Sequence, residues 1–376
     1  MAIKPLDFYK QLSSNEINFF SGVPDSLLKE FCLCIDDNIQ DKNHIITANE
    51  GNAIALASGY FLATSLLPLV YMQNSGLGNA INPLLSLCDR EVYSIPMLLL
   101  IGWRGEPGTK DEPQHIKQGA IQLELLRTLD IPYEIIFKDD INYIQKINNS
   151  IKKAKIESRP TAILIKKGTF KKYKKYFSNS INQKMKREDA LKIILDNLNE
   201  NDIIVSTTGK TSREIFEIRK SKNQEHNKDF LTVGSMGHCS SIALGIALKK
   251  PNRKIICIDG DGSMLMHLGN LTSITSLKPN NFYHILLNNE VHESVGGQST
   301  AAKFLNIANF TKSLGFNNSS KVSNKKDLQS SLSNFFLKNG PVFLEIEITP
   351  GSRDNLGRPT IAPKKNKLDF MKFLID

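Results

Sequence analysis

The segment from Cys257 to Glu290 constrains the fold more than any other part of the 376-residue chain. One apolar run ends in Gly-Asp-Gly-Ser at residues 260–263, and a second ends in Asn-Asn at residues 288–289. Each run is typical of a buried strand, and the regularly spaced apolar residues between them predict a helix that ends at Lys278-Pro279. The segment is therefore predicted to form a strand-helix-strand crossover.

Polar residues follow both predicted strands. In a parallel crossover the two strands point the same way, so Asp261 and Asn288 are expected at the same carboxyl edge of the sheet. These two oxygen ligands do not complete the octahedron of a magnesium ion, but phosphate oxygens, a backbone carbonyl and a water would. Gly260 and Gly262 would let backbone amides approach a phosphate. The segment predicts a magnesium-diphosphate site.

The two motifs at this spacing resemble the cofactor motif of thiamine-diphosphate enzymes. Other segments resemble that family in the same order along the chain: Gly22 to Ser26, Asn49 to Gly51, and residues 73–79, 103–108, 234–238 and 294–298. The loop at residues 102–115 and the glycine-rich segment at 291–300 resemble those of phosphonopyruvate decarboxylases, and sulfopyruvate decarboxylases have a related loop. The resemblance implies thiamine diphosphate and Mg²⁺ as cofactors.

The fold class implied is α/β, with two doubly wound parallel-sheet domains, one binding the pyrimidine and the other the diphosphate of the cofactor. The expected boundaries are a pyrimidine-binding domain at 1–170, a linker at 171–186 and a diphosphate- and Mg-binding domain at 187–376. The linker is placed where the sequence after residue 168 is basic, polar and unpatterned.

In the second domain the resemblance implies Asp261, Asn288 and the backbone carbonyl of Glu290 as metal ligands. It implies a larger set of cofactor-binding residues: Thr207, Thr208, Ser235, Met236, Gly260, Asp261, Gly262, Ser263 and Asn288. Met236 would hold the cofactor in its bent form. Read from the residues alone, Met236 is an ordinary core methionine, and the two threonine hydroxyls cap the next helix.

In the first domain Glu50 matches the glutamate that bonds the pyrimidine ring nitrogen in thiamine enzymes. From its position alone, Glu50 is a carboxylate in the first turn of a helix, where it interacts favourably with the helix dipole. In the family, Glu50 of one subunit and Asp261 of another would serve the same cofactor. The resemblance therefore implies an obligate homo-oligomer, a dimer or larger, with active sites between subunits.

Other polar residues become candidates through the same resemblance. Asp25, Ser26 and His115 are expected to relay protons, although Asp25 and Ser26 also suit ordinary helix capping. The long loop at 102–115 carries Arg104 and Lys110, which would supply cationic donors for a phosphonate group. Two arginines near the end of the chain are either solvated charges or part of the same anion pocket: Arg353 and Arg358.

Composition and charge argue against three other classes of protein: nucleic-acid-binding proteins, membrane or secreted proteins, and proteins built on zinc or disulfides. The net charge of +10 would suit a nucleic-acid ligand, but the lysines are scattered, and the cluster between Lys166 and Lys175 falls at the expected linker. No window approaches a membrane span, and the N-terminus has no basic region followed by an apolar one, so a cytoplasmic enzyme is expected. The five cysteines show no CxxC spacing and are expected as buried reduced thiols, with neither zinc nor a disulfide scaffold suggested.

The expected reaction is non-oxidative decarboxylation of 3-phosphonopyruvate to 2-phosphonoacetaldehyde and CO₂ through a thiamine diphosphate ylide, in phosphonate biosynthesis. A sulfopyruvate decarboxylase, or another 2-keto acid decarboxylase or carboligase, is the alternative among enzymes. A cofactor-sensing or scaffold subunit is the alternative outside enzymology. It has no need to keep Glu50, Asp261 and Asn288 together.

Overall fold

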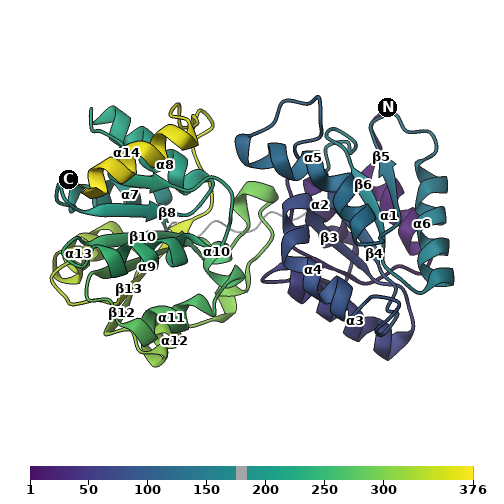
Figure 1. The fold of residues 1–376 in the computed structure, drawn as a ribbon, viewed down its shortest axis with the longest axis horizontal. Helices are drawn as coiled ribbons and strands as arrows, with labels where there is room; N and C mark the ends of the chain where they lie inside the picture. Colours follow the sequence, from purple (N-terminus) through teal and green to yellow (C-terminus); the bar gives the residue numbers. More distant parts are fainter. Residues whose placement is uncertain (175–183, 376) are drawn as a thin grey trace. The chain divides into compact units, whose positions relative to one another are not determined.

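A computed structural model describes residues 1–174 and 184–375. These residues form two compact units, one made of 1–174 with 295–298 and the other of 184–294 with 299–375 (Figure 1). The predicted linker at 171–186 overlaps the gap, and its residues 175–183 lie outside the described residues. Within the described ranges, no helix is both long enough and apolar enough to cross a membrane.

The first unit is built on a six-stranded sheet in the order β2-β1-β3-β4-β6-β5, in which every strand pair is parallel. Its strands are β1 (Phe20–Gly22), β2 (His44–Ile46), β3 (Leu69–Gln73), β4 (Leu98–Gly102), β5 (Tyr133–Ile136) and β6 (Thr161–Ile165). Its α-helices are α1 (Pro5–Ser13), α2 (Lys29–Asn38), α3 (Glu50–Thr64), α4 (Leu77–Ser86), α5 (Pro113–Thr128) and α6 (Tyr143–Glu157). Short 3-10 turns lie at Asp41–Asn43 and Asn74–Gly76.

Alternation along the strands divides the apolar side chains of this unit between two cores. In β3, Leu69 and Tyr71 pack with residues of α1, α2 and α6 on one face of the sheet. Val70 and Met72 pack with residues of α3, α4 and α5 on the other face. Because helices cover both faces, the central strands are apolar throughout, as is typical of a parallel sheet. The doubly wound α/β fold is confirmed for this unit.

The second unit has a seven-stranded sheet in the order β12-β13-β11-β10-β8-β9, with β7 paired to β13, and its strand pairs are also parallel. Its strands are β7 (Met185–Lys186), β8 (Ile203–Ser206), β9 (Asp229–Leu231), β10 (Ile255–Gly260), β11 (Phe282–Asn288), β12 (Asn318–Val322) and β13 (Val342–Thr349). Its α-helices are α7 (Arg187–Asp196), α8 (Lys210–Ser221), α9 (Cys239–Lys249), α10 (Asp261–Met266), α11 (Asn270–Leu277), α12 (Ile307–Leu314), α13 (Lys325–Phe335) and α14 (Pro363–Ile375). Two 3-10 turns lie at Glu293–Val295 and Ala301–Phe304.

The second sheet is also covered on both faces (Figure 1). In β10, Ile256 and Ile258 pack with residues of α7, α8 and α13. Ile255 and Cys257 face the opposite way and pack with residues of α9, α11 and α12. The doubly wound α/β fold is thus confirmed for the second unit as well.

The crossover between β10 and β11 differs from the prediction in one respect. The prediction of a single helix between these strands is wrong, because α10 ends at Met266 and α11 begins only at Asn270. His267 has φ −131° and ψ 50°, outside the helical region, and Gly269 lies two residues later. The spacing of the apolar residues could not reveal the break between the two helices, because Leu265 and Leu271 pack into the same core on either side of it.

Candidate active site

Asp261 and Asn288 follow neighbouring strands at the carboxyl edge of the second sheet. Gly260 and Leu287 are register partners in β10 and β11, so the next residue of each strand lies at the same edge. Asp261 is 3% exposed, and its Oδ2 accepts a hydrogen bond of 2.5 Å from Thr300 Oγ1. Burial raises the pKa of Asp261 to about 6, although this hydrogen bond and nearby backbone amides favour the ionised form. A cation at this carboxylate would relieve the cost of burying its charge.

Asn288 is 2% exposed, and both ends of its side-chain amide are bonded. Its Nδ2 donates to Glu345 Oε1 at 2.8 Å, and its Oδ1 accepts from the backbone N–H of Glu290 at 3.1 Å. Glu290 has a positive φ of 61°, and its carbonyl accepts from the backbone N–H of Thr300 at 2.8 Å. A carbonyl oxygen and an amide oxygen each keep a second lone pair, so both remain able to bind a hard cation.

Hydroxyl groups connect the ends of strands β8, β9 and β10. Thr207 Oγ1 donates to Ser263 Oγ at 2.9 Å, and Ser263 Oγ accepts from the backbone N–H of Gly237 at 3.1 Å. Thr208 Oγ1 accepts from the backbone N–H of Gly234 at 2.8 Å. The structure therefore brings the predicted hydroxyl residues Thr207, Thr208 and Ser263 to one edge of the sheet, together with the backbone of the turn after β9.

The turn between β9 and α9 has an unusual backbone. Gly234, Ser235 and Gly237 have positive φ values of 76°, 49° and 91°. Such a conformation costs about 1 kcal/mol or more for a residue with a side chain, as at Ser235, and is often found at functional sites. The turn presents Met236, which is half-buried, between these residues.

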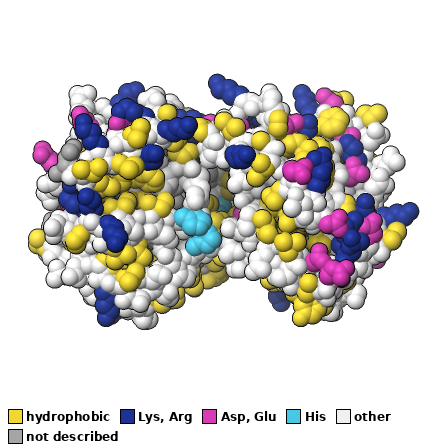
Figure 2. Space-filling view, in the orientation of Figure 1, with side chains coloured by type: hydrophobic (Ala, Val, Ile, Leu, Met, Phe, Trp, Pro, Cys, Tyr) yellow, Lys and Arg dark blue, Asp and Glu magenta, His cyan; other side chains and the backbone are white. Residues whose placement is uncertain are grey.

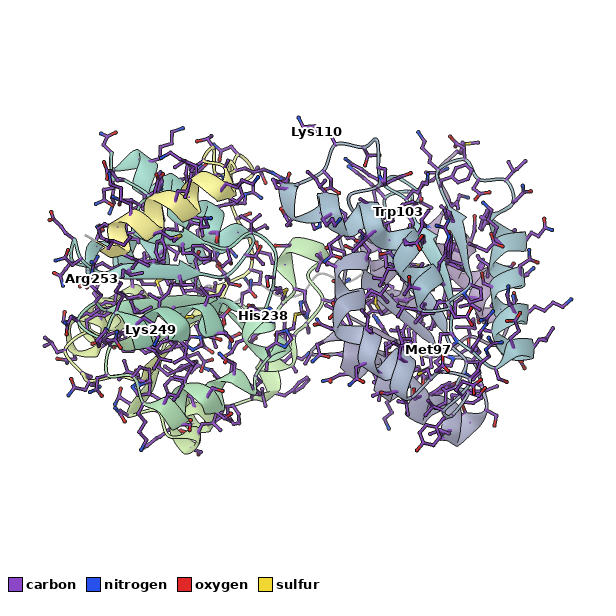
Figure 3. All side chains as sticks on the ribbon, viewed as in Figure 1. Met97, Trp103, Lys110, His238, Lys249 and Arg253 are labelled. Atoms are coloured by element: carbon purple, nitrogen blue, oxygen red, sulfur yellow. The ribbon has the colours of Figure 1, made fainter. Side chains whose placement is uncertain are left out.

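Two histidines lie beside this turn. Ser235 Oγ is 3.2 Å from Nδ1 of His238, and the ring of His238 lies against that of His267 with centroids 4.3 Å apart. His238 is labelled in Figure 3, and histidine side chains reach the surface in the same region of Figure 2. Burial, followed by the charge of His238, lowers the pKa of His267, which favours its neutral form.

Gly262 lies beneath two side chains that converge on it. A Cβ atom at Gly262 would lie 3.0 Å from Cε1 of His292 and 3.5 Å from Cε of Met236. The absence of a side chain at Gly262 therefore allows these groups to approach the turn. Burial lowers the pKa of His292 to about 4, so its imidazole is neutral at physiological pH. Sequence reasoning missed His292, whose only signal was its place in a glycine-rich segment after the Asn-Asn pair.

In the first unit, Glu50 begins α3 and is held by the turn that follows β3. Its side chain is 5% exposed, and Oε2 accepts from Nδ2 of Asn79 at 2.8 Å. A Cβ atom at Gly76 would lie 2.2 Å from Oε1, so the carboxylate rests directly on the Gly76 backbone. The structure thus places Glu50 in a first helical turn and fixes both of its oxygens through a second segment. Asn79 and Gly76 were not predicted as partners of Glu50.

Asp25 lies where the ends of β1, β3 and β4 meet, and it is fully buried. Its Oδ1 accepts from Gln73 Nε2 at 2.7 Å, and its Oδ2 accepts from the backbone N–H of Leu27 at 2.9 Å. A Cβ atom at Gly102 would lie 2.0 Å from Oδ2, so only glycine fits there. Burial raises the pKa of Asp25, although the hydrogen bonds and the charge of Arg104 act in the opposite direction.

Arg104 organises the loop that follows β4. Its Nε donates to Asp111 Oδ2 at 2.8 Å, its Nη2 donates to Asp111 Oδ1, and its Nη1 donates to Ser26 Oγ at 2.9 Å. Burial opposes the ionisation of Asp111, but the hydrogen bonds from Arg104 and Gly105 and the charge of Arg104 outweigh it and lower the pKa of Asp111 to about 2. Arg104, the residue predicted to bind the phosphonate, therefore forms a bidentate ion pair with Asp111 of its own loop.

His115 and Lys110 are close in the sequence, but His115 is buried and Lys110 is exposed. His115 is 9% exposed on α5, and its Nδ1 has no hydrogen-bond partner among the described residues. Burial and the charge of Arg104 lower the pKa of His115. Lys110 is exposed and extends from the loop, whereas Trp103 is buried and donates from Nε1 to the Gly119 carbonyl (Figure 3). The structure brings Asp25, Ser26, Arg104 and His115 together and leaves Lys110 at the surface.

The two C-terminal arginines have other surroundings. Arg353 forms ion pairs with Glu188 of α7, at 3.4 Å, and with Glu217 of α8. Arg358 is exposed. The role of these residues in an anion pocket stays a prediction, and for Arg353 it would require the guanidinium to leave two carboxylates.

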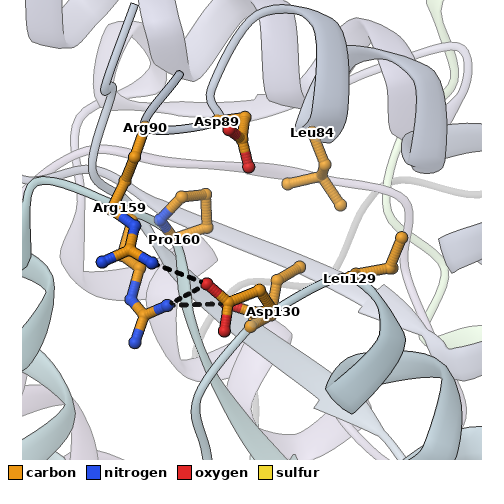
Figure 4. A pocket seen from close by; sticks show the side chains of 8 residues that line it. Leu84, Asp89, Arg90, Leu129, Asp130, Arg159 and Pro160 are labelled. Atoms are coloured by element: carbon orange, nitrogen blue, oxygen red, sulfur yellow. Dashed lines mark hydrogen bonds and ion pairs between the residues drawn. The ribbon is translucent and has the colours of Figure 1, made fainter. Parts of the chain in front are cut away.

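One small pocket lies far from the predicted residues in its unit (Figure 4). It is lined by Leu84, Asp89, Arg90, Leu129, Asp130, Ile131, Arg159 and Pro160. Residues 129–131 and 159–160 precede β5 and β6, so the pocket lies at the amino edge of the sheet. Ligands of doubly wound folds bind at the carboxyl edge. Its two arginines, moreover, already pair with Asp130.

Comparison with known proteins gives matches along the whole chain. The N-terminal TPP binding domain of thiamine pyrophosphate enzymes matches residues 7–126, and their C-terminal TPP binding domain matches residues 207–346. Phosphonopyruvate decarboxylase of Streptomyces viridochromogenes is 31% identical, with 98% of this chain and 94% of that protein covered. The protein of the same name from Streptomyces hygroscopicus is 30% identical, with coverage of 99% and 94%. Sulfopyruvate decarboxylase of Methanosarcina acetivorans is 26% identical, with 98% of each chain covered. The chain therefore belongs to the family of thiamine-pyrophosphate-dependent decarboxylases that includes the phosphonopyruvate decarboxylases.

Proposed function

We propose that the protein converts 3-phosphonopyruvate to 2-phosphonoacetaldehyde and CO₂ in phosphonate biosynthesis. The observation that carries this proposal is the similarity to two phosphonopyruvate decarboxylases, at 31% and 30% identity over nearly the whole chain. The sulfopyruvate decarboxylase that covers the same length is less similar, at 26% identity. We therefore assign phosphonopyruvate, rather than sulfopyruvate, as the substrate.

Thiamine diphosphate, when bound, supplies a thiazolium ring that accepts the electrons left behind as CO₂ departs. We expect Mg²⁺ to bind Asp261, Asn288 and the carbonyl of Glu290, which are oxygen donors of the kind that magnesium prefers. The diphosphate is expected beside the hydroxyl and glycine residues of the same edge: Thr207, Thr208, Ser235, Gly260, Gly262 and Ser263. The buried carboxylate of Asp261 and the missing side chain at Gly262 both suit this occupant.

Glu50 and Met236 are proposed to act on the pyrimidine half of the cofactor. Glu50 would share a proton with the pyrimidine ring nitrogen, and its fixed position against Gly76 and Asn79 would orient that proton. Met236 would support the bent cofactor from its strained turn. These two roles come from the family resemblance, and the contacts of Glu50 with Gly76 and Asn79 and the turn around Met236 support them.

The cluster at the edge of the first sheet is proposed to bind the substrate and move protons. Burial raises the pKa of Asp25, which favours a carboxyl group that can donate a proton, and Ser26 and His115 lie in the same cluster. Arg104 Nη1, which donates to Ser26, is the atom that would turn to a phosphonate oxygen. Lys110, Arg353 and Arg358 are weaker candidates for the same group.

We infer a homo-oligomer, a dimer or larger, with active sites between subunits. Helix α3 supports this, because Ala53, Ile54 and Ala57 pack into the core while Leu56 and Leu62 on other sides are 36% and 69% exposed. An apolar helix of this kind is usually covered by a partner. Light scattering of the purified protein should give a mass at least twice that of the chain, and an active monomer would contradict the inference.

The test is turnover of phosphonopyruvate by purified protein with thiamine diphosphate and Mg²⁺. CO₂ and phosphonoacetaldehyde should form together, and Glu50→Gln serves as the inactive control. Absence of both products with phosphonopyruvate would refute the proposed substrate. Because the sulfopyruvate decarboxylase also covers 98% of the chain, sulfopyruvate is assayed alongside, and the larger kcat/KM identifies the substrate. A hydroxyketone product would instead indicate a carboligase.

A further inference from the structure

Four side chains with metal-binding atoms lie together inside the second unit and have no role in the proposed reaction. Cys239 begins α9, Cys257 and Asp259 lie on β10, and His284 lies on β11. Cys239 is 2% exposed and the other three are fully buried. Cys257 and His284 are register partners in the parallel ladder, and Asp259 shares the face of Cys257 because side chains alternate along a strand. The fold therefore directs all four into one space beneath α9.

The distances among Cys239, Cys257 and Asp259 suit a tetrahedral ion. The Sγ atoms of Cys239 and Cys257 are 3.8 Å apart, and the ligand atoms of the two cysteines and Asp259 lie within 4.8 Å of one another. Nε2 of His284 lies 3.7 Å from Oδ2 of Asp259. Two thiolates bound to zinc at about 2.3 Å in tetrahedral geometry are themselves about 3.8 Å apart.

Polar atoms of the group lack hydrogen-bond partners among the described residues. Oδ2 of Asp259 and both ring nitrogens of His284 are buried without a hydrogen bond to any described residue. The histidine ring is instead surrounded by aromatic rings, with centroid distances of 6.1, 6.5 and 5.0 Å to Phe282, Phe316 and Phe343. Buried polar atoms are nearly always paired, and an exception in a native fold calls for an explanation such as a bound ion.

A disulfide is the competing use of two close cysteines. It would bring the sulfur atoms to about 2.05 Å but would leave Asp259 and His284 as they are. A metal ion would give partners to Oδ2 of Asp259 and to one nitrogen of His284 while also using both thiols. The unpartnered atoms therefore favour a metal.

We propose that Cys239, Cys257, Asp259 and His284 bind one structural zinc ion that joins α9 to β10 and β11. Cysteine, histidine and carboxylate side chains are the usual zinc ligands, and a site closed by four of them is structural in type. Zinc binds the thiolate form of cysteine, so the ion would displace the protons of both thiols as the protein folds around it. The spacing of the cysteines carried no such signal, since tertiary contacts alone bring them together.

The test is the zinc content of the untagged full-length protein, produced in zinc-supplemented medium and measured by inductively coupled plasma mass spectrometry. We expect about one zinc per chain in the wild type. Cys239→Ser and Cys257→Ser should lower it at least tenfold. Cys88→Ser, at a buried thiol of the first unit, should not change it. Asp261→Asn should also keep the zinc, because the ion does not occupy the proposed magnesium site.

Less than a tenth of a zinc per wild-type chain would overturn the proposal, as would equal zinc in the wild type and Cys257→Ser. A second measurement needs no variant. Wild-type protein refolded with Co²⁺ should show thiolate-to-cobalt charge transfer and the visible bands of a tetrahedral site, and their absence would also overturn it. A thiol titration of unfolded protein that finds a Cys239–Cys257 disulfide instead of free cysteines would favour the redox pair and refute the zinc site.

Discussion

Thr300 offers a way to test the proposed role of Asp261 without touching a metal ligand. Among the described residues, its hydroxyl is the one side-chain donor that stabilises the ionised form of Asp261, at 2.5 Å from Oδ2. Thr300→Val removes that donor and keeps the shape of the side chain. We expect the variant to bind Mg²⁺ more weakly in the presence of thiamine diphosphate, because magnesium binds the ionised carboxylate and a proton competes with it.

The size of the effect follows from the pKa. A hydrogen bond to a charged group contributes about 1.5–3 kcal/mol, and one pKa unit corresponds to about 1.4 kcal/mol, so the substitution should raise the Asp261 pKa by about one to two units. The pKa of Asp261 would therefore rise from about 6 to between about 7 and 8. At pH 7 the ionised fraction then falls from about 0.9 to between about 0.5 and 0.1, which weakens magnesium binding by about two- to tenfold. At pH 9 the carboxyl is ionised in both proteins, so most of the difference should vanish.

Isothermal titration calorimetry with Mg²⁺ at saturating thiamine diphosphate, from pH 6.5 to 9, measures this dependence. Thr311→Val is the matched control, since Thr311 is a fully buried threonine of α12 that donates to the Ile307 carbonyl. The control should bind Mg²⁺ like the wild type at every pH. An equal loss of affinity at pH 7 and pH 9, or no loss at pH 7, would refute the reasoning.

Three further predictions concern the first unit. Glu50→Gln should abolish CO₂ release while calorimetry finds thiamine diphosphate still bound, and unchanged turnover would argue against its proton-sharing role. Gly102→Ala should lower the free energy of unfolding by about 1–3 kcal/mol in urea titrations, because the new Cβ would lie 2.0 Å from Asp25 Oδ2, and wild-type stability would contradict that contact. Arg104→Lys keeps the charge but loses the bidentate pair with Asp111, so kcat/KM for phosphonopyruvate should fall about tenfold or more, and a fall below twofold would exclude Arg104 as a main substrate ligand.

Much of the fold could be predicted because its signals are local. The apolar runs before Asp261 and Asn288 mark buried parallel strands, and the topology rule for parallel crossovers then brings the two polar residues to one edge. Glu50 could be placed in the first turn of a helix for a similar reason, since the change from strand to helix is visible in its neighbours. These features depend on residues within one strand-helix-strand segment.

The features that were missed depend on contacts between distant segments. Thr300 bonds to Asp261, and Gln73 to Asp25, and no pattern in the sequence joins either pair. The ion pair between Arg104 and Asp111 was not predicted either, because Asp111 is one of several charges in the loop and only the folded loop selects it. Side-chain partners of this kind are determined by the packing of the loop, which residue spacing does not specify.

Strand β10 connects the two sites that we propose in the second unit. Asp261 follows its carboxyl end, at the edge where we propose the diphosphate site, while Cys257 and Asp259 on the strand face α9. Cys239, the proposed zinc ligand from α9, follows shortly after the strained turn that carries Met236. An ion that fixes the start of α9 to β10 would therefore also hold this turn in place. Loss of zinc in Cys257→Ser should weaken thiamine diphosphate binding, although Cys257 lies on the face of the strand that packs against α9.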